Sequence, residues 1–312
     1  MKETKKILTS LGYPEGDLYN LPSSSKRFPD GAQYRIELPS VEGPAALAAT
    51  FKEIDRYGLT VHRISQGSGI MLLTDGEIRE MAQLCASRKM ELSLFVGPRG
   101  TWDISPMPLT AAGKAGGIRH EGMDQIIYAI EDLKRAASLG VRGALVGDEG
   151  LVLLSKKLKE KGLLPENFVI KCSVQMMASN PVSIRLLQDC GANTYNLPTG
   201  LSLPKLAAIR QAVDIPLDMY VEAPDNFGGF IRHYEIPEFI RILAPVYIKF
   251  GLRNHPDVYP SGKQWEATNL LLCQERVHRA ALGMEMVKRY CPEAVASKAG
   301  PADLGIPVVT KS

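Results

Sequence analysis

The chain has 312 residues, of which 45% are hydrophobic and 23% are charged. This composition is typical of a globular protein with one large core or two modest ones, and it excludes an intrinsically disordered chain. The 37 basic and 34 acidic side chains leave a net charge of +3, so we expect no nucleic-acid partner. No apolar run approaches the roughly 18 residues that span a bilayer, so we expect no membrane partner either.

The sequence favours a cytoplasmic protein with reduced thiols. The apolar patch at Ile7-Leu8 is too short for the core of a secretory signal. The five cysteines are scattered, and no two of them form a CxxC pair. This pattern argues against a disulfide framework and against a structural zinc. The cysteines are Cys85, Cys172, Cys190, Cys273 and Cys291.

A strand-then-helix rhythm begins at Tyr34, after an arm of residues 1–33 that is rich in Pro, Ser, Gly and Tyr. Most predicted strands start roughly 22–32 residues apart, which is the length of one strand, one crossover helix and two loops. The predicted strands are Tyr34–Leu38, Leu59–Ile64, Glu91–Val96, Gly143–Gly147, Phe168–Val174, Thr194–Leu197, Pro216–Glu222 and Pro245–Phe250.

Start and stop signals mark the helices between these strands. Thr74 and Glu77 have the spacing of a capping box. Asn180-Pro181 predicts another helix start, and Gly191 predicts its end. The final helix is expected from about Glu266 to Arg289, and the Gly-rich stretch Ala111–Gly117 is expected to form a long loop at the barrel mouth.

Eight such units predict an α/β fold, a single (β/α)8 TIM barrel with an N-terminal arm and a long C-terminal helix. We expect the barrel at residues 34–295 and a C-terminal tail at residues 296–312. The alternative is a doubly wound open sheet, which would carry a Gly-rich phosphate loop after its first strand. Leu38–Pro44 does not have that composition.

The predicted barrel interior, called the lumen here, is unusually polar. Alternate residues of a barrel strand face the lumen, which is ordinarily filled by branched apolar side chains. Here the alternation directs Arg35, Glu37, His62, Lys171, Ser173, Gln175, Asn196, Asp218, Tyr220, Glu222, Tyr247 and Lys249 inward. Because an unpaired buried charge costs several kcal/mol, these groups must either form an ion-pair network, for example Arg35 with Asp218, or face a solvated pocket.

We expect the second outcome for the groups at the carboxyl ends of the strands, where barrel active sites lie. The predicted catalytic residues are Glu37, Glu222, Lys249 and His62. The predicted substrate-binding residues are Arg63, Gln66, Arg99, Glu149, Gln175, Asn196, Tyr220, Asn226 and Arg253. A divalent Mg²⁺ or Mn²⁺ ion held by Glu37, Glu149 and Glu222 remains open, because oxygen ligands suit these metals.

Three segments resemble peptidase family U32, the collagenase-like peptidases of unassigned catalytic type. They are the helix start and Gly-Ala turn at residues 180–193, the Leu-Ser-Leu helix entry at residues 200–210, and the strand at residues 215–222 that ends in Glu222. The family typically continues with a His-Gly-Ala-x-Cys segment, whereas residues 222–229 of this chain contain no cysteine. The resemblance therefore implies a divergent barrel member, and no iron–sulfur cluster is expected.

The leading hypothesis is an enzyme that acts on a small, polar, anionic substrate by acid/base chemistry at the barrel mouth, of the lyase, isomerase or hydrolase type. Glu37 and Glu222 would form the acid/base pair, and Lys249 would stabilise negative charge. The alternatives are a genuine U32-type peptidase, as the resemblance implies, and a non-catalytic metabolite-binding barrel. The last helix and Trp265 also offer a face for a homo-oligomer.

Overall fold

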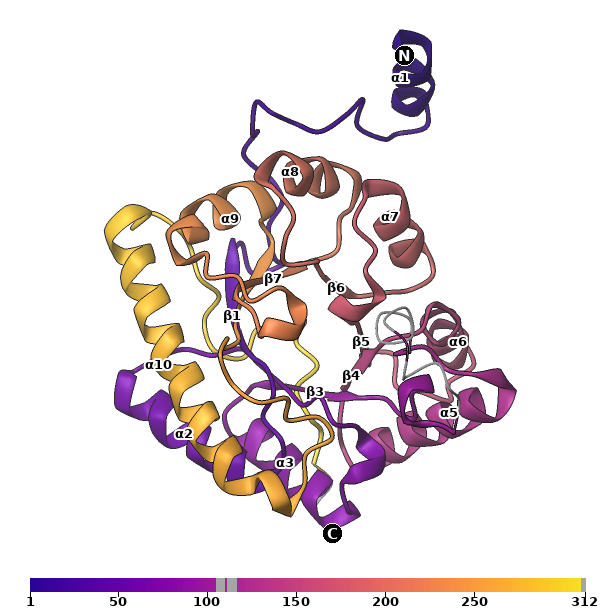
Figure 1. The fold of residues 1–312 in the computed structure, drawn as a ribbon, viewed down its shortest axis with the longest axis vertical. Coiled ribbons are helices and arrows are strands. Elements are labelled where there is room, and N and C mark those ends of the chain that lie inside the picture. The colour runs from indigo at the N-terminus through magenta and orange to yellow at the C-terminus, as the bar shows by residue number, and fades with distance from the viewer. Residues whose placement is uncertain (105–109, 111–116, 310–312) are drawn as a thin grey trace.

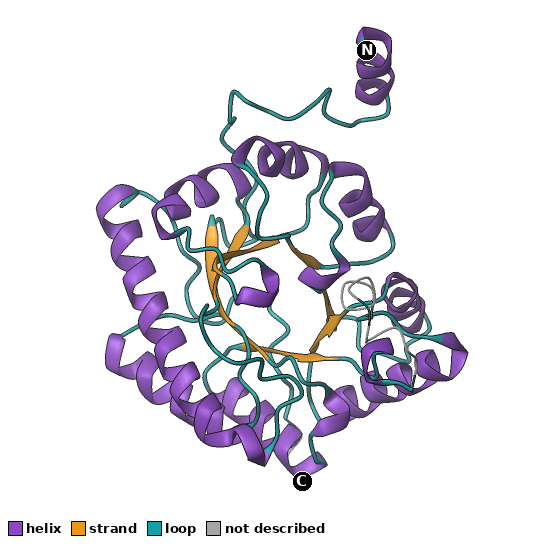
Figure 2. Ribbon diagram, in the orientation of Figure 1, coloured by secondary structure: helices purple, strands orange, loops and turns teal. Residues whose placement is uncertain are grey.

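The computed structural model, which describes residues 1–104, 110 and 117–309, forms a closed barrel. All eight strands are parallel and follow one another in chain order, and β8 pairs with β1 to close the ring. Figure 1 and Figure 2 show the strands as a central ring with helices around it. The predicted (β/α)8 barrel is confirmed, and the open sheet is excluded.

Each predicted strand overlaps an observed one. The strands are β1 (Tyr34–Leu38), β2 (Arg63–Ser65), β3 (Glu91–Phe95), β4 (Gly143–Val146), β5 (Val169–Cys172), β6 (Thr194–Asn196), β7 (Leu217–Glu222) and β8 (Val246–Phe250). The prediction for β2 was shifted, because its first predicted residues Leu59–His62 precede the strand.

The helical start signals are confirmed in their local geometry. The Thr74 side chain accepts a hydrogen bond from the Glu77 amide, and the Glu77 carboxylate accepts one from the Thr74 amide. The Asn180 side chain caps α7 by accepting a hydrogen bond from the Ser183 amide. The helices are α1 (Lys2–Ser10), α2 (Pro44–Tyr57), α3 (Asp75–Ser87), α5 (Gly122–Ser138), α6 (Glu149–Glu160), α7 (Pro181–Asp189), α8 (Leu203–Ala212), α9 (Ile236–Leu243) and α10 (Glu266–Tyr290). The loop expected at Ala111–Gly117 lies, except for its last residue, outside the described residues.

The two ends of the chain pack near the amino ends of the strands. In the arm, the Ser24 amide donates to Arg241 O, and the Phe28 ring packs edge-on against Tyr247. Helix α1, which the sequence patterns did not predict, stands away from the barrel (Figure 1), and none of its residues is buried. In the tail, Ser297 and Asp303 bind lumen side chains. Arm and tail together cover the amino end of the barrel.

The outward faces of the strands and the inner faces of the helices form the main apolar core. Met219 and Val221 of β7 and Ile248 and Phe250 of β8 are fully buried there. Across the described ranges, no helix combines the length and apolarity needed to cross a membrane. All five cysteines are free, as the sequence predicted.

Candidate active site

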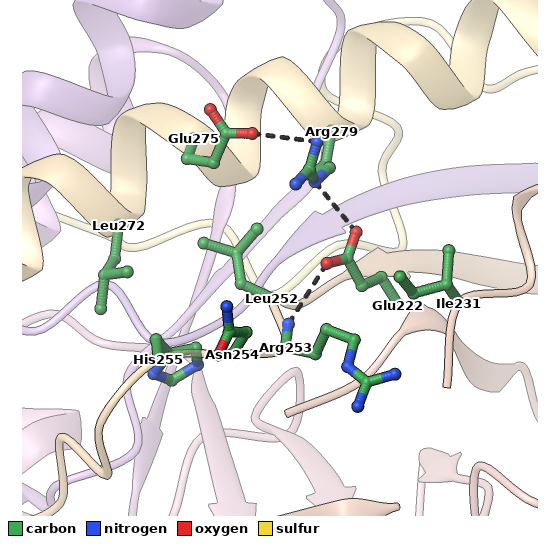
Figure 3. A pocket seen from close by; sticks show the side chains of 9 residues that line it. All are labelled: Glu222, Ile231, Leu252, Arg253, Asn254, His255, Leu272, Glu275 and Arg279. Carbon is green, nitrogen blue, oxygen red and sulfur yellow. Dashed lines mark hydrogen bonds and ion pairs between the residues drawn. The ribbon is translucent and has the colours of Figure 1, made fainter. Parts of the chain in front are cut away.

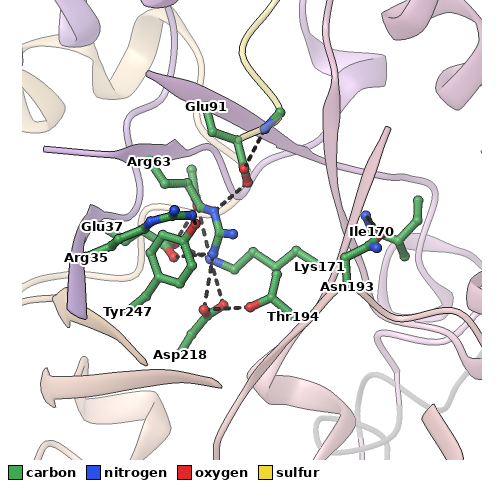
Figure 4. Close-up of polar contacts among 12 residues, drawn as sticks. Arg35, Glu37, Arg63, Glu91, Ile170, Lys171, Asn193, Thr194, Asp218 and Tyr247 are labelled. Atoms are coloured by element: carbon green, nitrogen blue, oxygen red, sulfur yellow. Dashed lines mark hydrogen bonds and ion pairs between the residues drawn. The ribbon is translucent and has the colours of Figure 1, made fainter. Parts of the chain in front are cut away.

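Ionisable side chains from six strands meet inside the barrel. Figure 4 shows Glu37, Arg63, Glu91, Lys171 and Asp218 among them. Contacts between strands that are not neighbours in the sheet, such as Glu37 of β1 with Lys171 of β5 and Arg63 of β2 with Asp218 of β7, can only cross the lumen. The group comprises Glu37, Arg63, Glu91, Lys171, Asp218 and Lys249, each at most 2% exposed. We call these six residues the lumen cluster.

Glu37 lies at the centre of the lumen cluster. Its Oε1 lies 3.1 Å from Lys249 Nζ, contacts Lys171 Nζ at close range and accepts a bond of 2.5 Å from Ser65 Oγ. Although burial alone would raise the pKa of the Glu37 carboxyl, the charges of Lys171, Lys249 and Arg63 hold it well below its usual range. Glu37 is therefore an ionised carboxylate shared by two ammonium groups.

The two lysines have different surroundings. Burial lowers the pKa of the Lys171 ammonium to about 7, although Asp218 and Glu37 act in the opposite direction. Lys249 donates to Asn196 Oδ1 at 3.0 Å, and its Nζ lies 4.4 Å from the centre of the Tyr220 ring. Lys249 thus forms the end of the lumen cluster that faces the barrel mouth, and Asn196 and Tyr220 contact it there.

At the opposite, amino end of the lumen, the polar side chains have structural roles. His62 does not enter the lumen cluster: its Nδ1 accepts from the Ile36 amide at 3.1 Å, and its Nε2 lies 2.9 Å from Ser297 O. Burial lowers the pKa of His62 to about 4, so the ring is neutral and Nε2 donates to the carbonyl. The pair of Arg35 with Asp218, which the sequence left open as an alternative, is not formed either, because Arg35 instead binds Asp303 of the tail through two bonds of 2.7 and 2.8 Å.

Glu222 lies apart from Glu37 and Lys249, and a β-bulge explains why. Tyr220 pairs with Lys249 and Glu222 pairs with Phe250, so two steps along β7 match one step along β8. A bulge of this kind turns the following side chain to the other face of the sheet. Glu222 consequently leaves the lumen and lies on the same face as Phe250, towards α10.

Glu222 forms part of a separate cavity of about 640 Å³ between the ends of β7 and β8 and helix α10 (Figure 3). Its Oε2 lies 3.0 Å from Arg279 Nε and 3.4 Å from His233 Nε2, and its Oε1 accepts from the Arg253 amide at 3.2 Å. Burial would raise the pKa of the Glu222 carboxyl, but these three contacts hold it below its usual value. We call this space the α10 cavity.

Arg99, a predicted substrate-binding residue, is 6% exposed on the loop after β3. Its guanidinium stacks between Phe95 and Trp102, at 3.9 and 4.1 Å from the ring centres, and donates to Gly67 O. Within the described residues it has no carboxylate partner, and its Nε has no hydrogen bond. Burial lowers its pKa to about 10, so the group remains a cation at neutral pH.

The other loop residues are dispersed. Gln66 braces its own turn by binding the amide and carbonyl of Gly69. Glu149 pairs with Arg119 at 2.6 Å, and Arg253 pairs with Asp225 at 3.1 Å, both near the surface. Gln175 is half-buried and Asn226 is exposed. These side chains do not join the lumen cluster.

The three carboxylates considered for a metal are not brought together. Glu37 is bound by lysines, Glu149 by Arg119, and Glu222 by Arg279. Throughout the described residues, no three His, Cys, Asp or Glu side chains gather as a metal site would require. These residues therefore do not fit a divalent ion.

The sequence patterns do not assign several residues of the site to the predicted catalytic or substrate-binding groups. Lys171 and Asp218 were predicted to face the lumen, but their place beside Glu37 was not recognised. Glu91 begins the predicted third strand and could have been found by applying the same alternation there. Arg279 had no signal, since its contact with Glu222 depends on how α10 crosses the end of β7.

Comparison with known proteins agrees with this architecture. The model of peptidase family U32 matches residues 120–223, a range that includes the segments predicted to resemble that family. No curated protein matches the chain.

Several solved structures are similar to the chain. The U32 peptidase Mk0906 is 14% identical, with a TM-score of 0.45 over 74% of this chain and 97% of its own. A candidate fructose-1,6-biphosphate aldolase from Coccidioides immitis is 12% identical, with a TM-score of 0.51 over 82% of this chain and 93% of its own. A truncated 3-deoxy-D-arabino-heptulosonate 7-phosphate synthase from Thermotoga maritima is 12% identical, with a TM-score of 0.47 over 88% and 95%. The aldolase likeness supports the barrel fold alone.

Proposed function

Since residues 120–223 of this chain match the model of peptidase family U32 and the described residues form a (β/α)8 barrel, we propose that the protein is a barrel enzyme. It acts on a small, polar, anionic substrate by acid/base chemistry at the carboxyl end of the lumen. The proposal retains Lys249 as a catalytic residue, adds Lys171, and gives Glu37 the role of a positioning residue.

One observation carries the proposal: two ammonium groups share the Glu37 carboxylate in a fully buried site, and the pKa of one of them, Lys171, is lowered to about 7 by burial. A lysine whose pKa lies near the working pH can both accept and return a proton. In this scheme neutral Lys171 removes a proton from the substrate. Lys249 then stabilises the developing negative charge, and Glu37 keeps the two nitrogens in place.

The anionic character of the substrate is supported by Arg99. The carboxylates of Glu42 and Asp257 act on the buried Arg99 guanidinium only from a distance, and within the described residues it forms no ion pair, which favours an anion as a contact partner. Tyr259 lies beside the Arg99 end of the proposed site, since its ring packs on Gly67 and the Gly67 carbonyl accepts from Arg99. Binding in this scheme requires the Tyr259 ring to move aside.

The test is a screen of small carboxylates and phosphate esters in D₂O, followed by proton NMR for exchange of carbon-bound hydrogen or for conversion. Lys171→Met and Lys249→Met should each lower the rate by about 10²-fold or more. Lys134→Met, which changes an exposed lysine on α5, should leave the rate unchanged.

A pH profile gives a second readout of the same experiment. Because Lys171 must be neutral to accept a proton, kcat/KM should rise with pH through about 7. A wild-type protein that leaves every compound of the panel unchanged, or a rate that survives both lysine substitutions, would contradict the proposal.

Peptidase activity is the second candidate, and it is favoured by the family match over residues 120–223. Burial raises the pKa of the thiols of Cys85, Cys172, Cys273 and Cys291, which argues against these cysteines as nucleophiles. Hydrolysis of casein or gelatin that withstands a thiol reagent would support this candidate. No hydrolysis, with or without a chelator, would remove it.

A further inference from the structure

A second cavity, of about 400 Å³, lies between the first turns of α2 and α10 and the turn after β2. We propose that this cavity binds an organic cation with a short apolar body, of the aliphatic amine class. The inference does not depend on the acid/base chemistry proposed for the lumen, and the residues concerned are different ones.

The lining of the cavity carries an excess of negative charge. Four carboxylates, of Glu42, Glu77, Glu80 and Glu266, face one ammonium, that of Lys263. The ammonium is already taken, since it lies 2.6 Å from Glu266 Oε2. Glu80 is exposed and forms no ion pair within the described residues. A positively charged group would therefore be attracted to the side of the cavity where Glu80 lies.

An unsatisfied amide oxygen gives independent evidence for a ligand. Asn269 lines the cavity and is only 2% exposed, yet its Oδ1 has no hydrogen-bond partner within the described residues. The orientation of this amide is fixed by its neighbour. The Ser261 hydroxyl donates its single proton to Val258 O at 2.5 Å, so it can only accept, and the group facing it at 3.0 Å must be the Asn269 NH₂. The free atom is therefore an acceptor, and it requires an N–H or O–H donor from a ligand.

The rest of the lining defines the kind of cation. Pro44, Ala45 and Ala48 of α2, together with Leu72, are apolar parts of the lining, and they suit a hydrocarbon chain and not a hydrated ion. The acidic groups are also not gathered as metal ligands, since no set of three suited to a metal exists in the described residues. Glu42, Glu77 and Glu266 already have partners in the structure. An alkyl ammonium would therefore pair with Glu80, donate to the Asn269 oxygen and pack its hydrocarbon chain on the apolar side chains.

The experiment is isothermal titration calorimetry of the full chain with 1,4-diaminobutane, with 1,4-butanediol as the neutral analogue and MgCl₂ as the metal control. We expect saturable binding of the diamine alone, weakened by added salt because the attraction is between charges near the surface. Glu80→Gln should weaken the affinity by about threefold to tenfold. Asn269→Ala should weaken it by about tenfold, the value of a hydrogen bond to a charged group.

A steric variant and a matched control keep the test decisive. Ala48 is exposed on α2, so Ala48→Phe should fill the cavity without disturbing the core and should abolish binding while the melting temperature stays unchanged. Glu285→Gln removes an exposed carboxylate of α10 that does not line the cavity, and it should bind as the wild type does. Absence of saturable diamine binding, equal binding of the diol, or diamine binding unaffected by Glu80→Gln and Ala48→Phe would each overturn the inference.

Discussion

Replacing Arg63 with methionine will leave one carboxylate of the lumen without a cation. Arg63 contacts three carboxylates: Nε lies 2.5 Å from Glu91, and Nη1 lies 3.1 Å from Asp218 and 3.3 Å from Glu37. Glu37 and Asp218 keep Lys171 as a partner after the change. Glu91 keeps only the Gly305 amide, at 3.0 Å, so the cost of the substitution concentrates on Glu91.

The size of the destabilisation follows from the fact that, among the described residues, only Glu91 loses its sole cationic partner. Removing one member of a buried ion pair costs about 3–5 kcal/mol, because the remaining charge is desolvated without compensation. Arg63→Met should therefore lower the free energy of unfolding by about that amount at neutral pH. Adding Glu91→Gln removes the unpaired charge and still allows the side-chain oxygen to accept from Gly305, so the double variant should recover most of the loss.

The assay is urea denaturation of the wild type, both single variants and the double variant, followed by circular dichroism. The expected coupling between the two sites is about 2–3 kcal/mol. Lowering the pH should also reduce the loss in the free energy of unfolding of Arg63→Met. A buried carboxyl without a cation takes up a proton more readily in the folded chain than in the unfolded chain, which is worth about 1.4 kcal/mol per pH unit. Additive effects of the two substitutions, or a deficit that does not shrink at lower pH, would refute the charge-pairing argument.

Three further predictions concern stability. The folded pKa of His62 is about 4, below the ordinary value of about 6.5, so between these pH values the unfolded chain binds a proton that the folded chain does not. The free energy of unfolding should therefore decrease by about 3 kcal/mol as the pH is lowered from about 6.5 to about 4. His62→Gln should flatten that part of the curve of stability against pH. Thr74→Ala removes the cap of α3 and should cost about 1 kcal/mol in urea denaturation, whereas Thr74→Ser should cost much less. Gly283→Ala places a methyl group against the buried Phe250 ring and should destabilise by about 1–3 kcal/mol despite the better helix propensity of alanine; a melting temperature at or above that of the wild type would show that the ring can shift.

The amino-acid sequence determined the barrel because its signals are local. The alternation within a strand such as Tyr34–Leu38, the capping box at Thr74 and the start at Asn180-Pro181 each act within a few residues. Repetition of these units then leaves few ways to bury every strand. The same alternation correctly directed Glu37, Lys171, Asp218 and Lys249 into the lumen. It failed for His62, because β2 begins only at Arg63, whose side chain enters the lumen, and His62 precedes the strand.

Which charges meet was decided only by the tertiary structure. A single bulge in β7 moves Glu222 from the lumen to the α10 cavity, and the path of the tail gives Arg35 the partner Asp303 in place of Asp218. Arg279 reaches Glu222 because α10 crosses the end of that strand. Such contacts join residues that are far apart in the chain, and the energy of a buried charge depends on distances of a few ångströms. Periodicity fixes the face on which a side chain lies, whereas its partner is set by register and by how the helices pack.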